Sequence, residues 1–354
     1  MAERAPELTH RPAAAAPATP AVRNRGRWRR SLPVRLVRWT WFLVVGLAAA
    51  GLLAHHLPVQ QPDWVPTASA ATLTVAYAFG LAARTGGRPV LASLVAAALV
   101  LAAVLTDRPV LLAGAAVSTT VLGTVLGVMA TVPAARFPAV VRECLVGAAV
   151  AGVAALAAAS DGAPLAVVRA EYLALALGLV GTLALVYRLG AGFSGLGRRG
   201  AIVVVGGTLL LAVVLAYAEA LSRWGPPGLL ETLQDGLAAV RDTIGATPRP
   251  VAALIGFPAL AWGVSTRARR RQGWWPTAFG AAGLAAVATS LVDRRTSDLE
   301  AVLETGYGVA AGLVLGYAVI RADAFLTGTR GRRARREEEA AAHRPEPRRT
   351  EPLL

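Results

Sequence analysis

Residues 201–221, AIVVVGGTLLLAVVLAYAEAL, decide the fold class, and they follow directly after Arg198 and Arg199. Glu219 is the only charged side chain in this stretch. A helix of about 20 apolar residues crosses a hydrocarbon core of about 30 Å. Such a helix satisfies its own backbone hydrogen bonds, which lipid cannot do. The stretch therefore predicts a transmembrane helix whose first end lies on an arginine-rich side of the membrane.

Nine other stretches share this length and apolar character. Together the ten lie at 39–57, 65–83, 89–105, 110–132, 138–159, 167–189, 201–221, 250–266, 275–292 and 299–320. The chain of 354 residues is 55% hydrophobic and 16% charged, which is too apolar for a water-soluble domain. We therefore predict an all-α fold, a polytopic transmembrane helix bundle of about ten spans that occupies residues 36–321.

The arginines predict the orientation of these spans. All 36 basic residues are arginine. Of these, 29 fall in the two tails or in every second gap between spans, counted from the N-terminal tail, and seven fall in the other gaps. Cationic loops resist transfer across the membrane, so the pattern predicts that both termini are cytoplasmic. Orientation and contact with anionic lipid explain the net charge of +15 without a nucleic-acid partner. The absence of lysine and the excess of alanine and glycine are typical of the codon bias of a high-GC, bacterial genome.

Two tails flank the predicted bundle. Residues 1–35 are rich in alanine, proline and then arginine, without apolar periodicity, which predicts a disordered basic arm. Residues 322–354 form a charged tail in which four arginines precede Glu337, Glu338 and Glu339, a run typical of a solvated extension. The bundle is expected in the plasma membrane, with both tails in the cytoplasm and their arginines against the anionic inner leaflet.

The acidic residues favour the opposite face. Twelve of the 21 acidic residues lie in the gaps or span ends assigned to the outside. Eight of these twelve belong to the second half of the chain, namely Glu219, Glu231, Asp235, Asp242, Asp293, Asp298, Glu300 and Glu304. Acidic residues contribute little to topology, so insertion does not require this excess. A site on the outer face is therefore expected in the second half of the chain.

The last span holds the most specific pattern in the sequence. Its members follow one another at intervals of four residues: Glu300, Glu304, Gly308, Gly312 and Gly316. This spacing places them on one face of a helix, with glycines that allow another helix to approach closely. One interpretation is a packing ridge. The other makes Glu304 an acidic group in a cavity for protons or a cationic solute, within reach of a hydrogen bond from Tyr307.

Other charges near the outer face are also candidates. Glu219 precedes Arg223 by four residues, the favourable order for an ion pair on a helix, which indicates a structural anchor. Arg169 and Glu171 open the sixth span. Because they are two residues apart, they cannot face one another on a helix, and one of them is expected to find its partner elsewhere in the bundle.

Polar or helix-breaking residues also occur within the spans. The eighth span contains Pro258, which predicts a kink of the kind at which carriers bind substrate. In the fourth span Thr119 and Thr124 belong to a polar run that either lines the same cavity or joins helices. Arg142 and Glu143 lie about one turn inside the fifth span, where they either extend to the cytoplasmic surface or serve as gate charges.

The long gap after the seventh span contains a helix of a different kind. Apolar residues recur at intervals of three and four within residues 228–245, at Leu230, Leu233, Leu237, Val240 and Ile244. This spacing predicts an amphipathic external helix that lies on the membrane interface or covers the bundle. A surface connector and a lid over a cavity are both compatible with it.

Cofactor and metal motifs are lacking in the sequence. Cys144 is the single cysteine, so neither an intramolecular disulfide nor a cysteine-based metal site is expected. His55 and His56 are adjacent and point about 100° apart on a helix, which makes a shared metal ion unfavourable. No nucleotide-binding loop or hydrolase triad occurs either, so no catalytic, cofactor-binding or metal-binding residue is assigned.

Three functions are compatible with these features. In topology the chain resembles the five-plus-five inverted-repeat carriers such as the drug/metabolite transporters, although no internal sequence repeat extends the resemblance to the residues. We expect an integral membrane permease or carrier for a small solute or protons. The alternatives are a non-catalytic envelope or assembly component with a membrane-protein partner, and a membrane-embedded enzyme that acts on a lipid-linked substrate.

Overall fold

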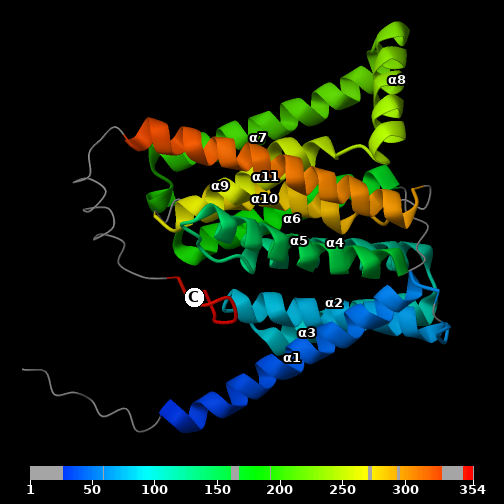
Figure 1. Cartoon of the computed structure of the whole chain (residues 1–354). Helices are drawn as coiled ribbons and strands as arrows, with labels where there is room; N and C mark the ends of the chain where they lie inside the picture. The colour runs from blue at the N-terminus through cyan, green and yellow to red at the C-terminus, as the bar shows by residue number, and fades with distance from the viewer. Residues whose placement is uncertain are drawn as a thin grey trace, which may run out of the picture. The chain divides into compact units, whose positions relative to one another are not determined.

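The computed structural model describes residues 27–58, 60–160, 167–191, 193–269, 273–292, 296–328 and 346–353. Within these ranges all regular structure is helical (Figure 1). Contacts divide the chain into two units, Met1–Thr40 and Trp41–Leu354. The first unit contributes only the beginning of the first helix to the described residues. The second unit contains the helical bundle.

A helix overlaps each predicted span, but α1 and α7 begin before the predicted limits and α11 ends after them. The first group is α1 (Arg27–His55), α2 (Trp64–Arg84), α3 (Pro89–Thr106), α4 (Pro109–Met129), α5 (Phe137–Ser160) and α6 (Val167–Val186), which continues into the π-helical turn η1 (Tyr187–Ala191). The second group is α7 (Phe193–Trp224), α8 (Pro227–Ile244), the π-helical turn η2 (Ala252–Gly256), α9 (Phe257–Arg267), α10 (Trp274–Ala288) and α11 (Asp298–Gly328). Helix α1 begins within the arm predicted to be disordered, whose first 26 residues lie outside the described ranges.

Eight of the described helices are long and apolar enough to cross a membrane, namely α1 to α7 and α11. The protein is therefore an α-helical, multi-pass membrane protein. The predicted eighth span is the helical run 250–267, in which η2 precedes α9, and the predicted ninth span is α10 with 15 residues. At 1.5 Å per residue they are about 27 and 22 Å long, shorter than a hydrocarbon core of about 30 Å. The count of ten spans thus stays a prediction.

Helix α10 is the centre of the bundle. Each of its residues except Ala286 is buried, and it packs against α4, α5, α6, α7, α9 and η2. Its backbone approaches that of η2 closely, because a Cβ atom added to Gly256 would lie only 2.1 Å from the backbone nitrogen of Gly283. Small residues permit such backbone contact where lipid supplies no hydrophobic force between helices. A helix that is apolar on every side is expected in this central position.

Helix α11 packs along η2 and α9 through the stripe of glutamates and glycines. The contacts run in order from Glu300 with Arg241 and Glu304 with Arg249 to Gly308 with Ala252, Gly312 with Phe257, and Gly316 with Ala261. Residue numbers rise together on both sides, so the two segments run parallel. Two spans separated by one intervening helix must run in the same direction, which agrees with α10 as the intervening helix.

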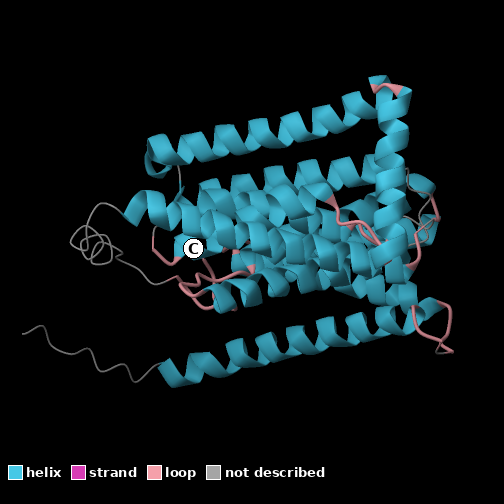
Figure 2. Cartoon of the chain, turned by 45° about the horizontal axis from the view of Figure 1, so that its top comes forward, coloured by secondary structure: helices cyan, strands magenta, loops and turns pink. Residues whose placement is uncertain are grey.

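Helix α8 differs from the bundle helices in direction and exposure. It runs across their direction, as Figures 1 and 2 both show, and has no buried residue. Its C-terminal end is held to α11, because the Tyr307 hydroxyl donates a hydrogen bond to the carbonyl oxygen of Ile244 at 2.8 Å. Gly245 then ends the helix with a φ of 82°, a left-handed conformation that favours glycine. The transverse helix therefore has one fixed end and an exposed apolar face.

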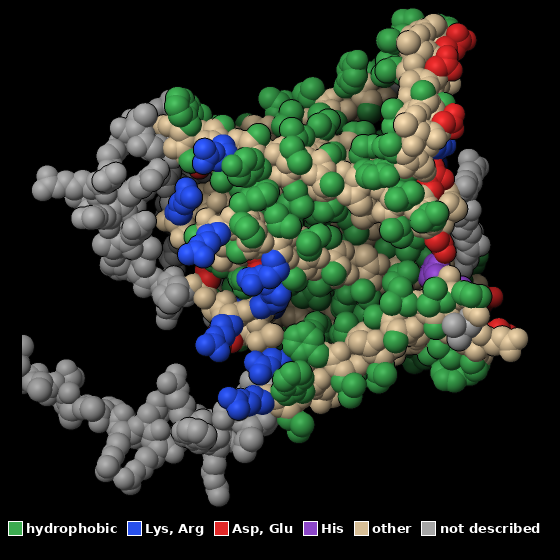
Figure 3. All heavy atoms as spheres, in the orientation of Figure 1, with side chains coloured by type: hydrophobic (Ala, Val, Ile, Leu, Met, Phe, Trp, Pro, Cys, Tyr) green, Lys and Arg blue, Asp and Glu red, His purple; other side chains and the backbone are tan. Residues whose placement is uncertain are grey.

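Charged side chains are concentrated at the two ends of the bundle. Figure 3 shows arginines gathered where α11 ends, and acidic side chains along α8 and where α11 begins. Apolar side chains cover the surface between these ends. We call the first the Arg267 end and the second the Arg249 end, after a central arginine at each. Such a division is typical of a protein whose middle is surrounded by lipid.

Candidate functional site

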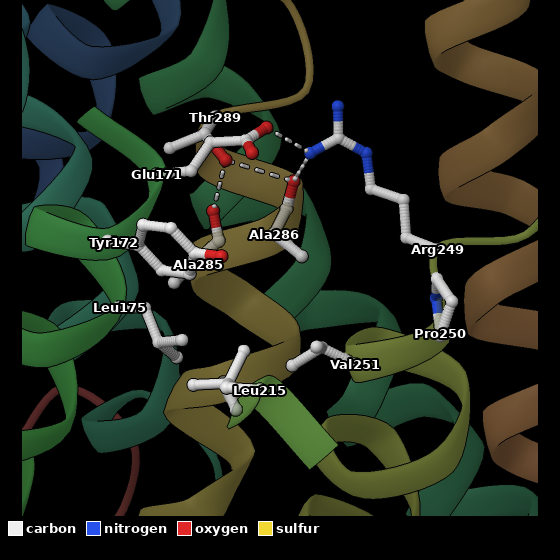
Figure 4. Close-up of a pocket in the computed structure, with 11 residues that line it drawn as sticks. Glu171, Tyr172, Leu175, Leu215, Arg249, Pro250, Val251, Ala285, Ala286 and Thr289 are labelled. Carbon is white, nitrogen blue, oxygen red and sulfur yellow. Dashed lines mark hydrogen bonds and ion pairs between the residues drawn. The ribbon is translucent and has the colours of Figure 1, made fainter. Parts of the chain in front are cut away.

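Arg249 lies at the centre of the charged groups of the Arg249 end. Its Nη1 atom is 3.0 Å from Glu171 Oε1 (Figure 4), and its Nε atom is 3.4 Å from Glu304 Oε2. Nη1 also donates a hydrogen bond to the carbonyl oxygen of Ala286 at 3.3 Å. One guanidinium thus joins α6, α10 and α11 to the segment that leads into η2. With two carboxylates for one cation, the three ionised groups carry a net charge of −1.

A cavity of about 310 Å³ lies beside this arginine. Its walls come from α6, α7, α10 and the residues before η2, and they consist of Glu171, Tyr172, Leu175, Leu215, Arg249, Pro250, Val251, Ala282, Ala285, Ala286 and Thr289. Figure 4 shows the Arg249 guanidinium directed towards Glu171 at one side, with Leu175, Leu215 and Val251 towards the other. Apolar walls with a few convergent polar groups are typical of small-molecule sites.

The alanines of α10 leave room for the cavity, which lies beside the residues that precede the π-helical turn η2. Pro258 has no N–H group to donate to the carbonyl of residue 254, and η2 immediately before it shifts the hydrogen bonding, so that Phe257 N donates to Ala252 O. On the other side, α10 presents Ala282 and Ala285, whose small side chains leave the cavity open. A larger residue at either position would fill it.

The structure brings together two of the acidic residues singled out in the sequence. Glu171 and Glu304 share Arg249, and Glu171 is thus the member of the 169/171 pair with a partner in another segment. Arg169 is exposed and does not line the cavity. Glu300 instead pairs with Arg241 of α8 at 2.9 Å, and Glu219 pairs with Arg223 at 2.5 Å.

Pro258 and the three glycines of α11 lie away from the cavity. A Cβ atom on Gly312 would be 2.5 Å from Phe257 Cβ and 3.3 Å from Pro258 Cδ, and one on Gly316 would be 2.8 Å from Ala261 Cβ. Gly308 is more open, with Ala252 Cβ at 3.5 Å. Pro258 and these glycines form a tight contact between helices. The interrupted helix contributes to the cavity lining only through Arg249, Pro250 and Val251, which precede η2.

Other polar groups singled out in the sequence have partners outside the cavity. Tyr307 bonds to Ile244 rather than to Glu304, because its hydroxyl reaches the end of α8. Thr119 Oγ1 lies 2.7 Å from Thr74 Oγ1 and joins α4 to α2 outside the cavity. His56 Nδ1 lies 2.8 Å from Asp298 Oδ2. Among the described residues no group of three His, Cys, Asp or Glu side chains could hold a metal ion.

Arg249 is the site residue that no motif in the sequence singles out. It is one of the seven arginines in the gaps assigned to the outer face. The available signal was its position, since Arg249 directly precedes Pro250 at the start of a short, interrupted span. No known family model, curated protein or solved structure matches the chain, so the geometry alone has to support a function.

Proposed function

We propose that the protein is a carrier for a small organic cation, embedded in the plasma membrane through ten spans with both termini in the cytoplasm. The observation that carries this proposal is the shared ion pair of Arg249 with Glu171 and Glu304 at an apolar cavity of about 310 Å³. In that orientation the Arg249 end faces outwards. The carboxylates supply the charge recognition, and the apolar walls accept the body of the solute.

The exposure of the three charged groups favours a cation as the solute. The Glu171 side chain is 36% exposed, against 21% for Arg249 and 13% for Glu304. Glu171 is thus the group that a solute reaches first, and a cation there would compete with Arg249 for it. Arg249 would keep Glu304 as its partner, so no buried charge is left unpaired by the exchange.

Binding by the purified protein is the first test. Tetraethylammonium and a series of small alkylammonium ions, each matched with a neutral analogue of similar size, would be screened for a shift in thermal unfolding in detergent. A bound ligand stabilises the folded state in proportion to RT ln(1 + [L]/Kd), so the cations should raise the unfolding temperature and the neutral analogues should not. Ions that bind would then be tested for counterflow in proteoliposomes.

Three variants separate recognition at the cavity from general charge effects. Glu171→Gln and Glu304→Gln should abolish the stabilisation by cations and the counterflow. Glu219→Gln, which removes a carboxylate paired with Arg223 outside the cavity lining, should preserve both. The proposal fails if no cation stabilises the protein, or if Glu171→Gln and Glu304→Gln behave as Glu219→Gln does.

The orientation has its own test. Cys144 is buried, so single cysteines introduced elsewhere can be labelled with a membrane-impermeant maleimide in intact cells. Gln234→Cys in α8 and Ala135→Cys between α4 and α5 occupy exposed positions. Labelling of Gln234→Cys alone supports the proposed orientation, whereas labelling of Ala135→Cys alone indicates the opposite orientation, with the Arg267 end outside.

A non-catalytic assembly component is the second candidate, and the exposed face of α8 favours it. Leu233 and Leu237 are 43% and 55% exposed, and Val240 is 41% exposed. The glycine stripe of α11, in contrast, is already occupied by η2 and α9, so it does not favour docking of another protein. Two results together would favour this function over transport. A membrane-protein partner should co-purify with the parent protein but not with the Leu233→Ser/Leu237→Ser variant, and the parent protein should bind no cation.

A further inference from the structure

Buried charges also lie at the Arg267 end of the bundle, far along the helices from Arg249. Arg84 of α2, Glu143 of α5 and Arg267 of α9 are 4%, 0% and 6% exposed, respectively. Removing an ionised group from water is costly unless it is paired and hydrogen-bonded. The partners of these three side chains therefore determine how this end of the bundle is closed.

All three charges are paired with one short segment, residues 346–353 near the C-terminus. Arg349 Nη2 lies 2.8 and 2.6 Å from the two carboxylate oxygens of Glu143. Glu346 Oε2 lies 2.5 Å from Arg267 Nη2. The segment was expected to be solvated, but Glu346 and Arg349 have charges opposite to those buried in the bundle. Charge complementarity is thus the physical reason that it docks.

The backbone of the segment contributes as well. Arg84 donates hydrogen bonds from Nη1 to the carbonyl oxygens of Arg348, at 2.7 Å, and of Glu351. In return, Leu353 N donates to the carbonyl oxygen of Arg84 at 2.8 Å. The segment is thereby fixed in register over its whole length. A contact made only by flexible surface charges would not position main-chain atoms in this way.

The bundle holds its own side of this contact in place independently of the segment. Arg267 donates to Thr131 Oγ1 at 2.8 Å and to the Thr131 carbonyl at 3.0 Å, and its guanidinium carbon lies 3.5 Å from the centroid of the Trp274 ring. Glu143 accepts a hydrogen bond from Val132 N at 3.0 Å. Arg84 Nε donates to Met129 O at 3.0 Å. We call Arg84, Thr131, Glu143 and Arg267 the terminal socket.

The composition of the segment favours a separable contact. Pro347 and Pro352 restrict the backbone of the segment before it binds, which lowers the entropy that docking costs. A preorganised socket and a conformationally restricted peptide are the two halves of a peptide-recognition site.

We infer that the terminal socket is a peptide-binding site whose ligand is the protein's own segment 346–353, bound reversibly. Recognition is by charge order: an acidic residue on Arg267, a basic residue three positions later on Glu143, and main-chain carbonyls on Arg84. When bound, the segment lies over the ends of α2, α5 and α9. This inference does not depend on the transport function.

The test uses a chain that ends at Pro345 and a fluorescein-labelled synthetic peptide of residues 343–354. Fluorescence anisotropy in detergent should show saturable binding of the peptide to the shortened protein. The matched control peptide carries Glu346→Arg and Arg349→Glu together, which preserves composition and net charge but reverses the charge order. It should bind about 10- to 100-fold more weakly, because both ion pairs become like-charge contacts. Equal affinity of the two peptides, or no binding of either by a folded shortened protein, overturns the inference.

The full-length chain provides a second measurement in case the shortened protein does not fold. Hydrogen exchange of the Leu353 amide, which is bonded to Arg84 O, reports whether the segment is docked. In the full-length Glu346→Arg/Arg349→Glu variant this amide should exchange at least about tenfold faster, while the amides of α10 keep their protection. If Leu353 stays protected in this variant, the ion pairs do not hold the segment and the inference is wrong.

Discussion

The contact between α11 and the interrupted helix can be tested by adding a single methyl group. In Gly312→Ala the new Cβ would lie 2.5 Å from Phe257 Cβ and 3.2 Å from the Ala252 carbonyl oxygen. Carbon atoms in contact are about 3.5–4.0 Å apart, so α11 and α9 would have to separate by about 1 Å or more. The backbone of η2 lies on the other side of the contact and cannot rotate away as a long side chain could.

The magnitude follows from two opposing effects. Overpacking of a close contact costs about 1–3 kcal/mol. Replacement of a helical glycine by alanine stabilises the helix by about 1 kcal/mol. Gly306 lies on the same helix and has no heavy atom within 4 Å of its added Cβ, so Gly306→Ala gains the helix effect without the clash. The free energy of unfolding of Gly312→Ala should therefore be about 1–3 kcal/mol below that of Gly306→Ala.

Reversible unfolding in mixed micelles, titrated with SDS and followed by far-UV circular dichroism, measures this difference. Both variants would be prepared in the same detergent as the parent protein. A third variant, Gly308→Ala, should match Gly306→Ala, because its added Cβ would be 3.5 Å from Ala252 Cβ, an ordinary contact distance without a clash. If Gly312→Ala and Gly306→Ala change the free energy of unfolding equally, α11 does not pack closely on η2 and α9.

Three further predictions concern the charged groups and the transverse helix. Arg249→Gln should lower the free energy of unfolding by about 1–3 kcal/mol in the same titration, because it leaves Glu171 and Glu304 without their shared cation; a change below about 0.5 kcal/mol would contradict the pairing. Glu143→Gln should lower it by about 2–4 kcal/mol, whereas Arg142→Gln, whose side chain is 67% exposed, should change it by less than about 1 kcal/mol. Tyr307→Phe should accelerate hydrogen exchange at the C-terminal end of α8 without altering exchange in α10, and unchanged exchange in α8 would show that this hydroxyl does not hold the helix.

The helix boundaries could be predicted because local signals determine them. Apolar length, arginines in alternate gaps, and prolines at helix starts such as Pro89 and Pro109 do not depend on how the helices pack. The amphipathic seam at 228–245 differs by one residue at each end from α8 (Pro227–Ile244). The spacing of the α11 stripe likewise placed its members on one face, since helical geometry alone decides this.

The partners across the bundle could not be predicted in the same way. Glu171 meets Arg249, 78 residues further along the chain, and Glu143 meets Arg349, 206 residues away. Each of these pairs depends on which helices become neighbours, and hydropathy carries no information about neighbours. The docking of residues 346–353 has one signal in the sequence, a run in which prolines and charges of both signs precede two leucines. That run also fits a solvated tail, so it does not distinguish the two.

The central position of α10 also bears on how the protein is synthesised. Helices α4, α5 and α6 leave the ribosome well before residues 274–288, yet each of them packs against α10. Until α10 is inserted, their inner faces must be covered by lipid or by temporary neighbours. Completion of the native core therefore waits for one of the last helices, and synthesis interrupted before Trp274 would yield a chain with most of its membrane helices but no centre. Such a chain would be an early target for membrane quality control.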